Sequence, residues 1–274
     1  MKRLSLCMIV RNEERHIRRC LESMGNVADE IVVVDTGSTD RTVEICQSFG
    51  AEVHVFPWND SFADARNYGL ERAAGEWIIY LDADEELETG DRPKLKDAII
   101  SQEADLLAVR ILNYSGKTPD LNDAYFIEQY RIFRKGLGLQ FKQDIHEMLN
   151  VEETRQRLTA ASLPITIHHY GYLEQAAELK RKHMRNLRIL EKEMAKPEHS
   201  PWIEYHAASE YYRIGKYETA LRYVNQAILM FLQAGTLPPS LLYKLKYEML
   251  LSPDKAHQAL ATIDFAIQNV SRLC

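Results

Sequence analysis

Two carboxylates that directly follow an apolar run are the residues of this sequence best suited to do chemistry. The run 77–81 is rich in β-branched and aromatic residues, and Asp82 and Asp84 come next, with the small Ala83 between them. Such a run predicts a buried strand, which delivers the residues after it to the sheet edge where open α/β folds bind ligands. Neighbouring carboxylates repel unless a cation or a hydroxyl-rich ligand lies between them, and hard divalent ions prefer oxygen ligands. The pattern indicates a site for a metal-bound diphosphate, although a solvated turn with an acidic helix cap uses the same residue types.

The residues before this site alternate between predicted strands and helices. Apolar runs at 4–10, 31–34 and 52–56 predict strands, and the stretches between them have the apolar spacing of helices. This rhythm predicts an α/β fold with a mainly parallel sheet and helices on both faces. The turn at 11–13 contains no glycine, which argues against the Gly-rich phosphate turn of a dinucleotide-binding fold.

Composition narrows the class of protein. The chain has 274 residues, 46 % hydrophobic and 27 % charged, as expected of one or two globular domains. Its net charge of −6 argues against nucleic acid as the main partner. The four cysteines form no Cys-x-x-Cys pair, which fits a reducing cytoplasm, and the run 4–10 is too short to span a bilayer. We therefore expect a cytoplasmic protein with no membrane span.

Five short segments, in this order and at this spacing, resemble a family 2 glycosyltransferase with the Rossmann-like GT-A fold. They are residues 9–13, 34–40, 65–67 with Trp58 and Phe62 before them, 75–77, and 81–85. Each segment alone is a weak pattern, whereas the ordered set is specific. The resemblance implies a nucleotide-diphosphate-sugar donor, by family habit a UDP-sugar, and a divalent cation, Mn²⁺ or Mg²⁺.

The resemblance also implies roles for three aspartates. In that family the aspartate after the second strand binds the base of the nucleotide, which implies this role for Asp35. The first aspartate of the Asp-x-Asp pair reaches the ribose and the second the metal, which implies these roles for Asp82 and Asp84. The chemistry agrees, because a carboxylate accepts well from imide and hydroxyl groups, and a metal neutralises a departing diphosphate.

Five further residues lie in the matched segments and are expected around the nucleotide. They are Val10, Asn12, Glu13, Arg66 and Ala83. For Arg66 the competing interpretation is an ordinary surface arginine at the start of a helix.

The second half of this domain is less regular, as an acceptor-binding region would be. Residues 106–114 and 125–133 have the pattern of strands. The following Arg131-x-Phe-Arg134 and the segment 141–147 resemble the branch of the family that adds sugars to lipopolysaccharide core or to peptide cysteine. We expect Arg131, Arg134 and, within that segment, His146 to contact the diphosphate or substrate.

An inverting transferase needs a base that takes the proton from the attacking acceptor group. Glu147 is the first candidate for this catalytic role, and Asp144 is the second. The alternative is that His146 and Glu147 form a structural hydrogen-bonded pair without a part in proton transfer.

A late strand and the basic helix after it add three candidates. Residues 163–172 predict a last short strand, with Gly171 permitting a tight exit. The family's His-x-Gly-Tyr pattern falls on His169 rather than on its neighbour, which implies that His169 completes the metal site. Lys182 and Arg185 lie three apart in the following basic run, so both could reach a diphosphate, although such runs are usually solvated faces.

Beyond residue 197 the pattern changes to helix upon helix. Small and aromatic residues match a tetratricopeptide repeat at positions 208, 211, 212, 215, 217, 220 and 227. Ala259 and Ala266 suggest a degenerate second copy 39 residues later. We expect a catalytic domain at 1–172, a connecting basic helix at 173–200 and an all-α tetratricopeptide-like region at 201–274.

These observations favour a metal-dependent, inverting glycosyltransferase that acts on a saccharide, lipid-linked or peptide acceptor. Its C-terminal helices could bind a protein partner or a second copy of the chain. Two alternatives are a sugar-nucleotide nucleotidyltransferase, which would want a Gly-rich phosphate cradle, and a non-catalytic scaffold that senses nucleotide sugar.

Overall fold

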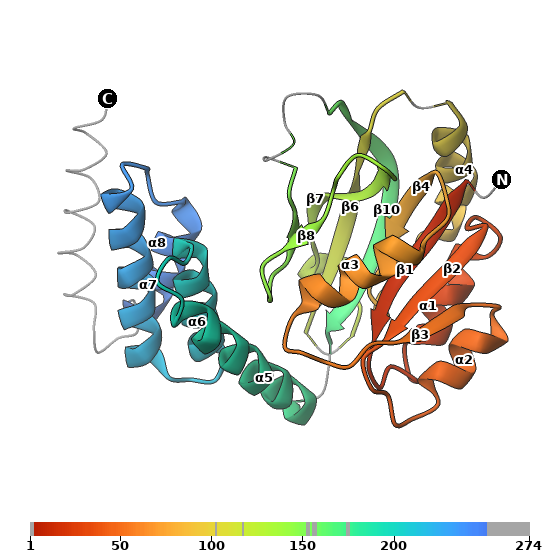
Figure 1. Ribbon diagram of the computed structural model, residues 1–274. Helices are drawn as coiled ribbons and strands as arrows, with labels where there is room; N and C mark the ends of the chain where they lie inside the picture. The colour runs from red at the N-terminus through yellow and green to blue at the C-terminus, as the bar shows by residue number, and fades with distance from the viewer. Residues whose placement is uncertain are drawn as a thin grey trace. The chain divides into compact units, whose positions relative to one another are not determined.

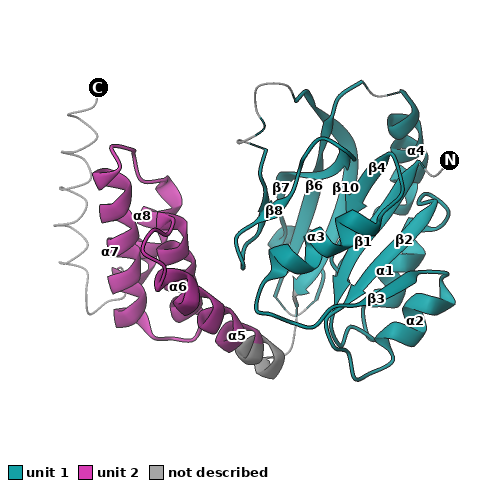
Figure 2. Cartoon of the chain, in the orientation of Figure 1, with its two compact units in different colours: residues 1–175 teal, residues 176–274 magenta. Residues whose placement is uncertain are grey.

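The structure is a computed structural model that describes residues 3–101, 103–116, 118–151, 154, 158–173 and 176–250. The chain divides into two compact units, residues 1–175 and 176–274 (Figure 2). The connecting basic helix expected at 173–200 corresponds to α5, which belongs to the second unit. No helix of the described residues is long and apolar enough to cross a membrane.

The first unit is built on one large sheet with the strand order β3-β2-β1-β4-β7-β6-β10-β5 (Figure 1). Its strands are β1 Leu4–Val10, β2 Glu30–Asp35, β3 Glu52–Val55, β4 Trp77–Tyr80, β5 Glu85–Leu87, β6 Leu106–Ser115, β7 Tyr125–Arg134 and β10 Ala160–Tyr172. A separate small pair consists of β8 Phe141–Lys142 and β9 Met148–Leu149. The helices are α1 Ile17–Met24, α2 Thr42–Ser48, α3 Phe62–Arg72 and α4 Arg92–Ser101.

The half of the sheet that the sequence patterns describe best is parallel. Strands β3, β2, β1 and β4 run in one direction, and β6 runs parallel to β10. Strand β7 is antiparallel to both of its neighbours, and β5 is antiparallel to β10. The α/β class is therefore confirmed, with a mixed second half, because the short connection from β6 to β7 returns the chain in the opposite direction.

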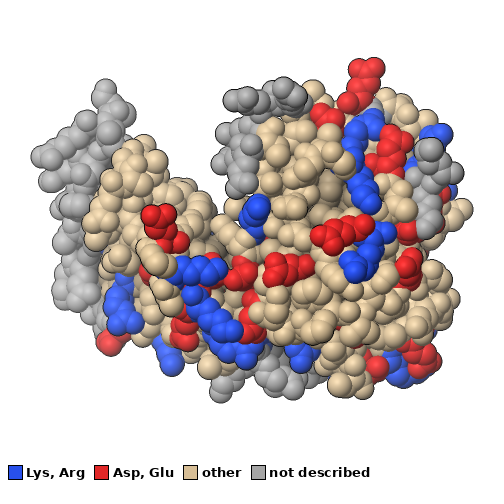
Figure 3. All heavy atoms as spheres, viewed as in Figure 1, with Lys and Arg blue, Asp and Glu red and all other residues tan. Residues whose placement is uncertain are grey.

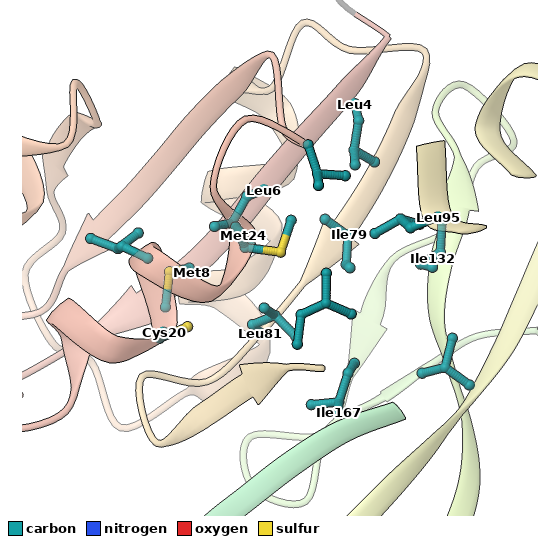
Figure 4. Packing of buried hydrophobic residues seen from close by; sticks show 14 of the residues in the cluster. Leu4, Leu6, Met8, Cys20, Met24, Ile79, Leu81, Leu95, Ile132 and Ile167 are labelled. Atoms are coloured by element: carbon teal, nitrogen blue, oxygen red, sulfur yellow. The ribbon is translucent and has the colours of Figure 1, made fainter. Parts of the chain in front are cut away.

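Helices cover both faces of this sheet because its central strands are apolar on both sides. On one side, Leu4 and Leu6 of β1 and Ile79 of β4 pack in a core with residues of α1, α2 and α4 (Figure 4). On the other side, Cys7 and Ile78 belong to a second core that includes Ala73, directly after α3. The central strands are thus held from both sides, which fixes the positions of the loops at their ends.

The second unit contains α5 Ala176–Met194, α6 Pro201–Arg213, α7 Tyr217–Gln233 and α8 Ser240–Leu250. Helices α6 and α7 form the expected hairpin, in which Gly215 has a φ of 78° that favours glycine. The small residues expected between the helices, Ala208, Ala220 and Ala227, are fully buried in its core. The second copy expected at Ala259 and Ala266 lies outside the described residues.

Helices α5 and α6 are joined through a buried carboxylate. Glu210 on α6 is 1 % exposed and accepts from Nδ2 of Asn186 on α5 at 3.1 Å. Nδ1 of His183, also on α5, lies 2.5 Å from the same carboxyl group. These contacts satisfy a group that would otherwise be costly to bury.

On the face of the molecule in Figure 3, acidic and basic side chains are interspersed.

Candidate active site

The ends of β1 and β2 bring the first group of predicted residues together. Val10 and Asp35 are partners in the parallel register, so both strands end at the same level. Asn12 follows β1 with a φ of 58°, and its Oδ1 accepts from the Thr39 amide at 2.7 Å. The backbone amide of Asn12 in turn donates to Oγ of Ser38 at 2.9 Å. Asn12 therefore ties the loop after β1 to the loop after β2.

Asp35 is the buried carboxylate of this corner, with 4 % of the residue exposed. It accepts backbone hydrogen bonds from Gly37 at 3.2 Å and from Ser38 at 3.1 Å. The Glu13 amide donates to the Thr42 hydroxyl at 2.7 Å, which fastens the second loop at its far end. The aspartate thus shapes its own loop, while the remaining acceptor capacity of a carboxylate is available to a ligand.

Arg66, on α3, connects the first aspartate of the Asp-x-Asp pair to the first candidate base. Its Nη2 donates to Oδ1 of Asp82 at 2.7 Å, and its Nε donates to Oε1 of Glu147 at 2.6 Å. The guanidinium lies near the rings of Tyr80 and Phe141, at 5.3 and 5.4 Å from their centroids. Burial opposes the charge of Arg66, but the two carboxylates outweigh it and raise its pKa. Burial likewise opposes the charge of Asp82, and Arg66 nevertheless lowers the pKa of that carboxyl group.

The same helix holds the loop that carries both candidate bases. The Asn67 side chain donates to the Phe141 carbonyl at 2.9 Å and accepts from the Phe141 amide at 2.8 Å. The Phe62 amide donates to the carbonyl of Asp144 at 2.8 Å. Within this loop His146 has a φ of 54°, which is unusual for a residue with a side chain. The α3 helix therefore places Glu147 beside Asp82, while Asp144 is fixed through its backbone.

The second aspartate of the pair faces the histidine of the late strand. Oδ2 of Asp84 lies 3.7 Å from Nε2 of His169 on β10. Burial favours the neutral imidazole, but Asp84 outweighs this effect and raises the pKa of His169. Across the ring, Nδ1 of His169 is 2.8 Å from Oδ1 of Asn113 on β6. Asp84 thus offers an oxygen ligand and His169 a nitrogen ligand, and both atoms suit Mn²⁺.

Gly171 leaves the space beside the Asp84 carboxylate and the His169 ring open. A Cβ atom at this position would lie 2.3 Å from Oδ2 of Asp84 and 2.7 Å from Nε2 of His169. The sequence suggested a tight exit here, whereas Gly171 lies inside β10, and the close approach of two side chains accounts for it. Among the described residues no group of three or more His, Cys, Asp and Glu side chains could hold a metal ion. A cation at Asp84 and His169 would therefore need further ligands from the diphosphate or water.

Glu85 and Arg131 form a buried layer behind the Asp-x-Asp turn. Nη2 of Arg131 donates to Oε1 of Glu85 at 2.6 Å, and the other carboxyl oxygen accepts from the Asp82 amide at 2.8 Å. Burial raises the pKa of Glu85 to about 7, and the charge of Arg131 offsets only part of this effect. Ala83, in the same turn, is 5 % exposed and leaves no bulk beside the carboxylates. Arg131 thus supports the Asp-x-Asp turn indirectly, through Glu85.

Of the other predicted substrate contacts, Arg134 lies away from this site. Arg134 pairs with Glu76 and is the register partner of Trp77, the first residue of β4, whereas Asp82 follows the other end of that strand. The structure therefore does not bring Arg134 to the site, because the antiparallel β7 carries it to the opposite edge. Lys182 and Arg185 lie on α5 in the second unit.

Sequence reasoning missed Asn113 and did not find the roles of Glu85 and Gly171 in this site. Asn113 gave no signal, because a lone asparagine in a strand is unremarkable until the β6–β10 register places it beside His169. Glu85 entered only as the last residue of the matched segment 81–85. Gly171 could have been interpreted as a close-approach glycine, since a glycine inside a strand often has this meaning.

Comparison with known proteins identifies the family and supports the fold. A family model, "Glycosyl transferase family 2", matches residues 5–161. A TPR repeat-containing protein of Synechococcus elongatus is 31 % identical over 96 % of this chain and 65 % of its own length. The glycosyltransferase SunS of Bacillus subtilis is 27 % identical over 81 % of this chain and 52 % of its own. The chain thus spans between about half and two-thirds of these curated relatives.

Solved structures share the fold at low identity. TarS of S. aureus in complex with UDP-GlcNAc has a TM-score of 0.52 at 16 % identity and covers 89 % of this chain and 83 % of its own. Glucosyl-3-phosphoglycerate synthase of Mycobacterium tuberculosis, in complex with Mn²⁺, UDP and its product, has a TM-score of 0.50 at 17 % identity, covering 69 % and 78 %. The first unit therefore has the GT-A fold of glycosyltransferases. The chain belongs to glycosyl transferase family 2.

Proposed function

We propose that this chain moves a sugar from a nucleotide-diphosphate donor, a UDP-sugar, to a nucleophile on a saccharide, lipid-linked or peptide acceptor, with inversion. The observation that carries the proposal is the pair Asp84 and His169, which face each other across Gly171 at the sheet edge that also carries Asp82. Family membership supports a sugar-transfer activity, and relatives of the same fold bind UDP-GlcNAc or UDP with Mn²⁺.

The donor end of the site uses the aspartates at the ends of β2 and β4. Asp35 would bind the base, and Asp82, which Arg66 keeps ionised, would accept from a ribose hydroxyl. Val10, Asn12, Glu13 and Ala83 would line the nucleotide at these strand ends. Asp84 and His169 would hold Mn²⁺ or Mg²⁺, which supplies charge neutralisation of the departing diphosphate.

The acceptor end of the site uses the loop that α3 holds. Inversion requires a base on the side opposite the leaving diphosphate, within reach of the acceptor hydroxyl or thiol. Glu147 is the first candidate for this base, and its support is that Arg66 holds it beside Asp82 and that its side chain is 12 % exposed. Asp144 is the second candidate, and His146 would contact substrate from the same loop.

The remaining residues would support the site in other ways. Arg131 would support the Asp-x-Asp turn through Glu85. Lys182 and Arg185 of α5 would contribute positive charge to the diphosphate. Partner binding or self-association would use the α6–α8 helices, because so few helical repeats need another surface to cover them.

The test is release of UDP from UDP-sugars in the presence of Mn²⁺. Slow hydrolysis needs donor, cation and a working leaving-group site together, so it separates a transferase from a scaffold that only binds. We expect UDP release from at least one common UDP-sugar with Mn²⁺ and none with chelator. Absence of release and of Mn²⁺-dependent UDP binding would overturn the proposal.

A further inference from the structure

Asn113 lies beside His169 in the pairing of β6 with β10, and only 4 % of it is exposed. The two ends of its amide have different partners. Its Nδ2 donates to the Ile111 carbonyl at 3.4 Å, and its Oδ1 lies 2.8 Å from Nδ1 of His169. A carbonyl needs a donor and an amide nitrogen supplies one, so this pair of contacts sets the orientation of the amide.

The orientation of the amide decides which nitrogen of His169 carries the hydrogen. Oδ1 of an asparagine can only accept, so Nδ1 of His169 must donate. In the neutral imidazole the other nitrogen, Nε2, then has a free lone pair. That nitrogen faces Oδ2 of Asp84 at 3.7 Å, across the space that Gly171 leaves open.

We propose that Asn113 is a positioning residue that holds His169 in the tautomer and ring orientation whose Nε2 binds the divalent cation with Asp84. This inference rests on the proposed function, because it concerns the cation of that site. It follows a general rule of metal centres: a ligating histidine donates its other N–H to a fixed acceptor, and loss of that acceptor weakens metal binding.

The neighbouring histidine provides an internal comparison. His168 lies on the same strand, but its Nδ1 is 2.9 Å from the hydroxyl of Tyr114 and its Nε2 is 3.1 Å from Oε2 of Glu88. The ring nitrogens of His168 therefore have partners other than Asp84, whereas Nε2 of His169 faces Asp84. The two histidines share a strand and a residue type, so a variant of His168 is a matched control.

The first experiment measures the tautomer directly. The ¹⁵N shifts of the imidazoles, recorded for the full chain with UDP and the diamagnetic Mg²⁺, distinguish an Nδ1–H from an Nε2–H tautomer, and His169→Gln assigns the signal. We expect His169 to be the Nδ1–H tautomer. A predominant Nε2–H tautomer would overturn the proposal. This measurement needs no variant at Asn113, so it decides the point even if such a variant fails to fold.

The second experiment measures the cation itself, with Mn²⁺ and UDP as probes. Asn113→Leu should weaken Mn²⁺ binding by roughly 10- to 100-fold in calorimetry, whereas Asn113→Asp, which still accepts from Nδ1–H, should stay within about threefold of wild type. The ¹⁴N coupling to bound Mn²⁺ in pulsed electron paramagnetic resonance should persist in wild type and in His168→Gln. It should be weakened in Asn113→Leu and lost in His169→Gln.

Two outcomes contradict this account in distinguishable ways. Wild-type Mn²⁺ binding together with unchanged affinity in Asn113→Leu would overturn the role of Asn113 and leave the proposed function intact. Failure of the wild-type chain to bind Mn²⁺ with UDP would overturn both.

Discussion

Oδ2 of Asp84 and Nε2 of His169 lie 3.7 Å apart, although one residue follows β4 and the other belongs to β10. They meet because the Asp-x-Asp turn leads directly into β5, which pairs with β10 so that His169 is the partner of Glu85. The backbone amide of Tyr170 also donates to the Asp84 carbonyl at 3.1 Å, which fastens the turn to the strand. Sheet pairing therefore fixes the distance between the two donors before any ligand binds.

Replacing the metal-binding carboxylate should abolish only the cation-dependent part of nucleotide binding. We expect Asp84→Ala to lose the Mn²⁺-dependent increase in UDP affinity in calorimetry and to keep its fold, because removal of one of two repelling carboxylates should not destabilise a strand end. The exposed Asp97 on α4 provides the control Asp97→Ala. Retained Mn²⁺ dependence in Asp84→Ala would refute the metal assignment.

The space beside Gly171 gives a second, independent test of the same site. Gly171→Ala should block the cation, because the new Cβ would lie 2.3 Å from Oδ2 of Asp84. The control is Gly90→Ala, where the nearest atom to the new Cβ is 4.0 Å away. We expect Mn²⁺-dependent UDP binding to be lost in the first variant and kept in the second. Normal Mn²⁺ affinity in Gly171→Ala would show that the cation lies elsewhere.

The parallel half of the sheet could be predicted from the sequence because its strands are continuous apolar runs. Residues 4–10 and 77–80 are buried on both faces, and such runs need no knowledge of their neighbours to be recognised. The insertion of β7 between β4 and β6 could not be predicted, since it depends on long-range antiparallel pairing. That pairing also explains why Arg134, close in sequence to Arg131, lies at the opposite edge.

The residues of the site likewise divide into those that the sequence could predict and those that depend on the fold. Asp82 and Asp84 come from a local pattern, whereas the proximity of Arg66 to Glu147 depends on how α3 packs on a loop far along the chain. Asn113 depends on register alone, and a shift of one residue would turn its side chain to the other face of the sheet. Motifs therefore located the chemistry, while the partners of each motif required the fold.

Asp35 should matter for the nucleotide with or without Mn²⁺. Asp35→Ala should weaken UDP binding by the value of a charge-assisted hydrogen bond, about 1.5–3 kcal/mol. It should also lower the free energy of unfolding, because the amides of Gly37 and Ser38 lose their acceptor. Asp35→Asn keeps one acceptor oxygen, so its fold should be less affected while UDP still binds more weakly. Unchanged UDP affinity in Asp35→Asn would place the base in a different position.

Arg66 should contribute to stability as well as to the site. Arg66→Met should lower the free energy of unfolding by about 3 kcal/mol, because it removes the buried guanidinium that bridges two carboxylates. The matched control is Arg18→Met, which removes an exposed pair with Glu22 at 4.0 Å and should change stability by about 0.5 kcal/mol or less. Equal denaturant midpoints for the two variants would contradict the bridging role of Arg66.

The two candidate bases should differ in their effect on transfer. Glu147→Gln keeps an oxygen that accepts from Arg66, so donor affinity should be nearly unchanged while transfer to a confirmed acceptor falls by roughly 10²- to 10⁴-fold. Asp144→Asn should be milder, because it is Glu147 that Arg66 holds beside Asp82. Normal turnover of Glu147→Gln would rule it out as the base.

The size of this defect reports on the acceptor. A cysteine thiol with a pKa of about 8.5 is already partly ionised near neutrality, whereas a sugar hydroxyl is not. The loss in Glu147→Gln should therefore be smaller for a peptide thiol than for a saccharide acceptor. Comparing the pH dependence of transfer for the two acceptor types would check this difference.

The central claim is that the strand ends of the first unit bind a nucleoside diphosphate through a divalent cation held by Asp84 and His169. Its most direct test is calorimetric titration of UDP into the wild-type chain with Mn²⁺ and with chelator, repeated with His169→Gln and His168→Gln. We expect UDP binding that strengthens with Mn²⁺ in wild type and His168→Gln, and no Mn²⁺ effect in His169→Gln. Equal UDP affinity with and without Mn²⁺ in the wild-type chain would contradict the account.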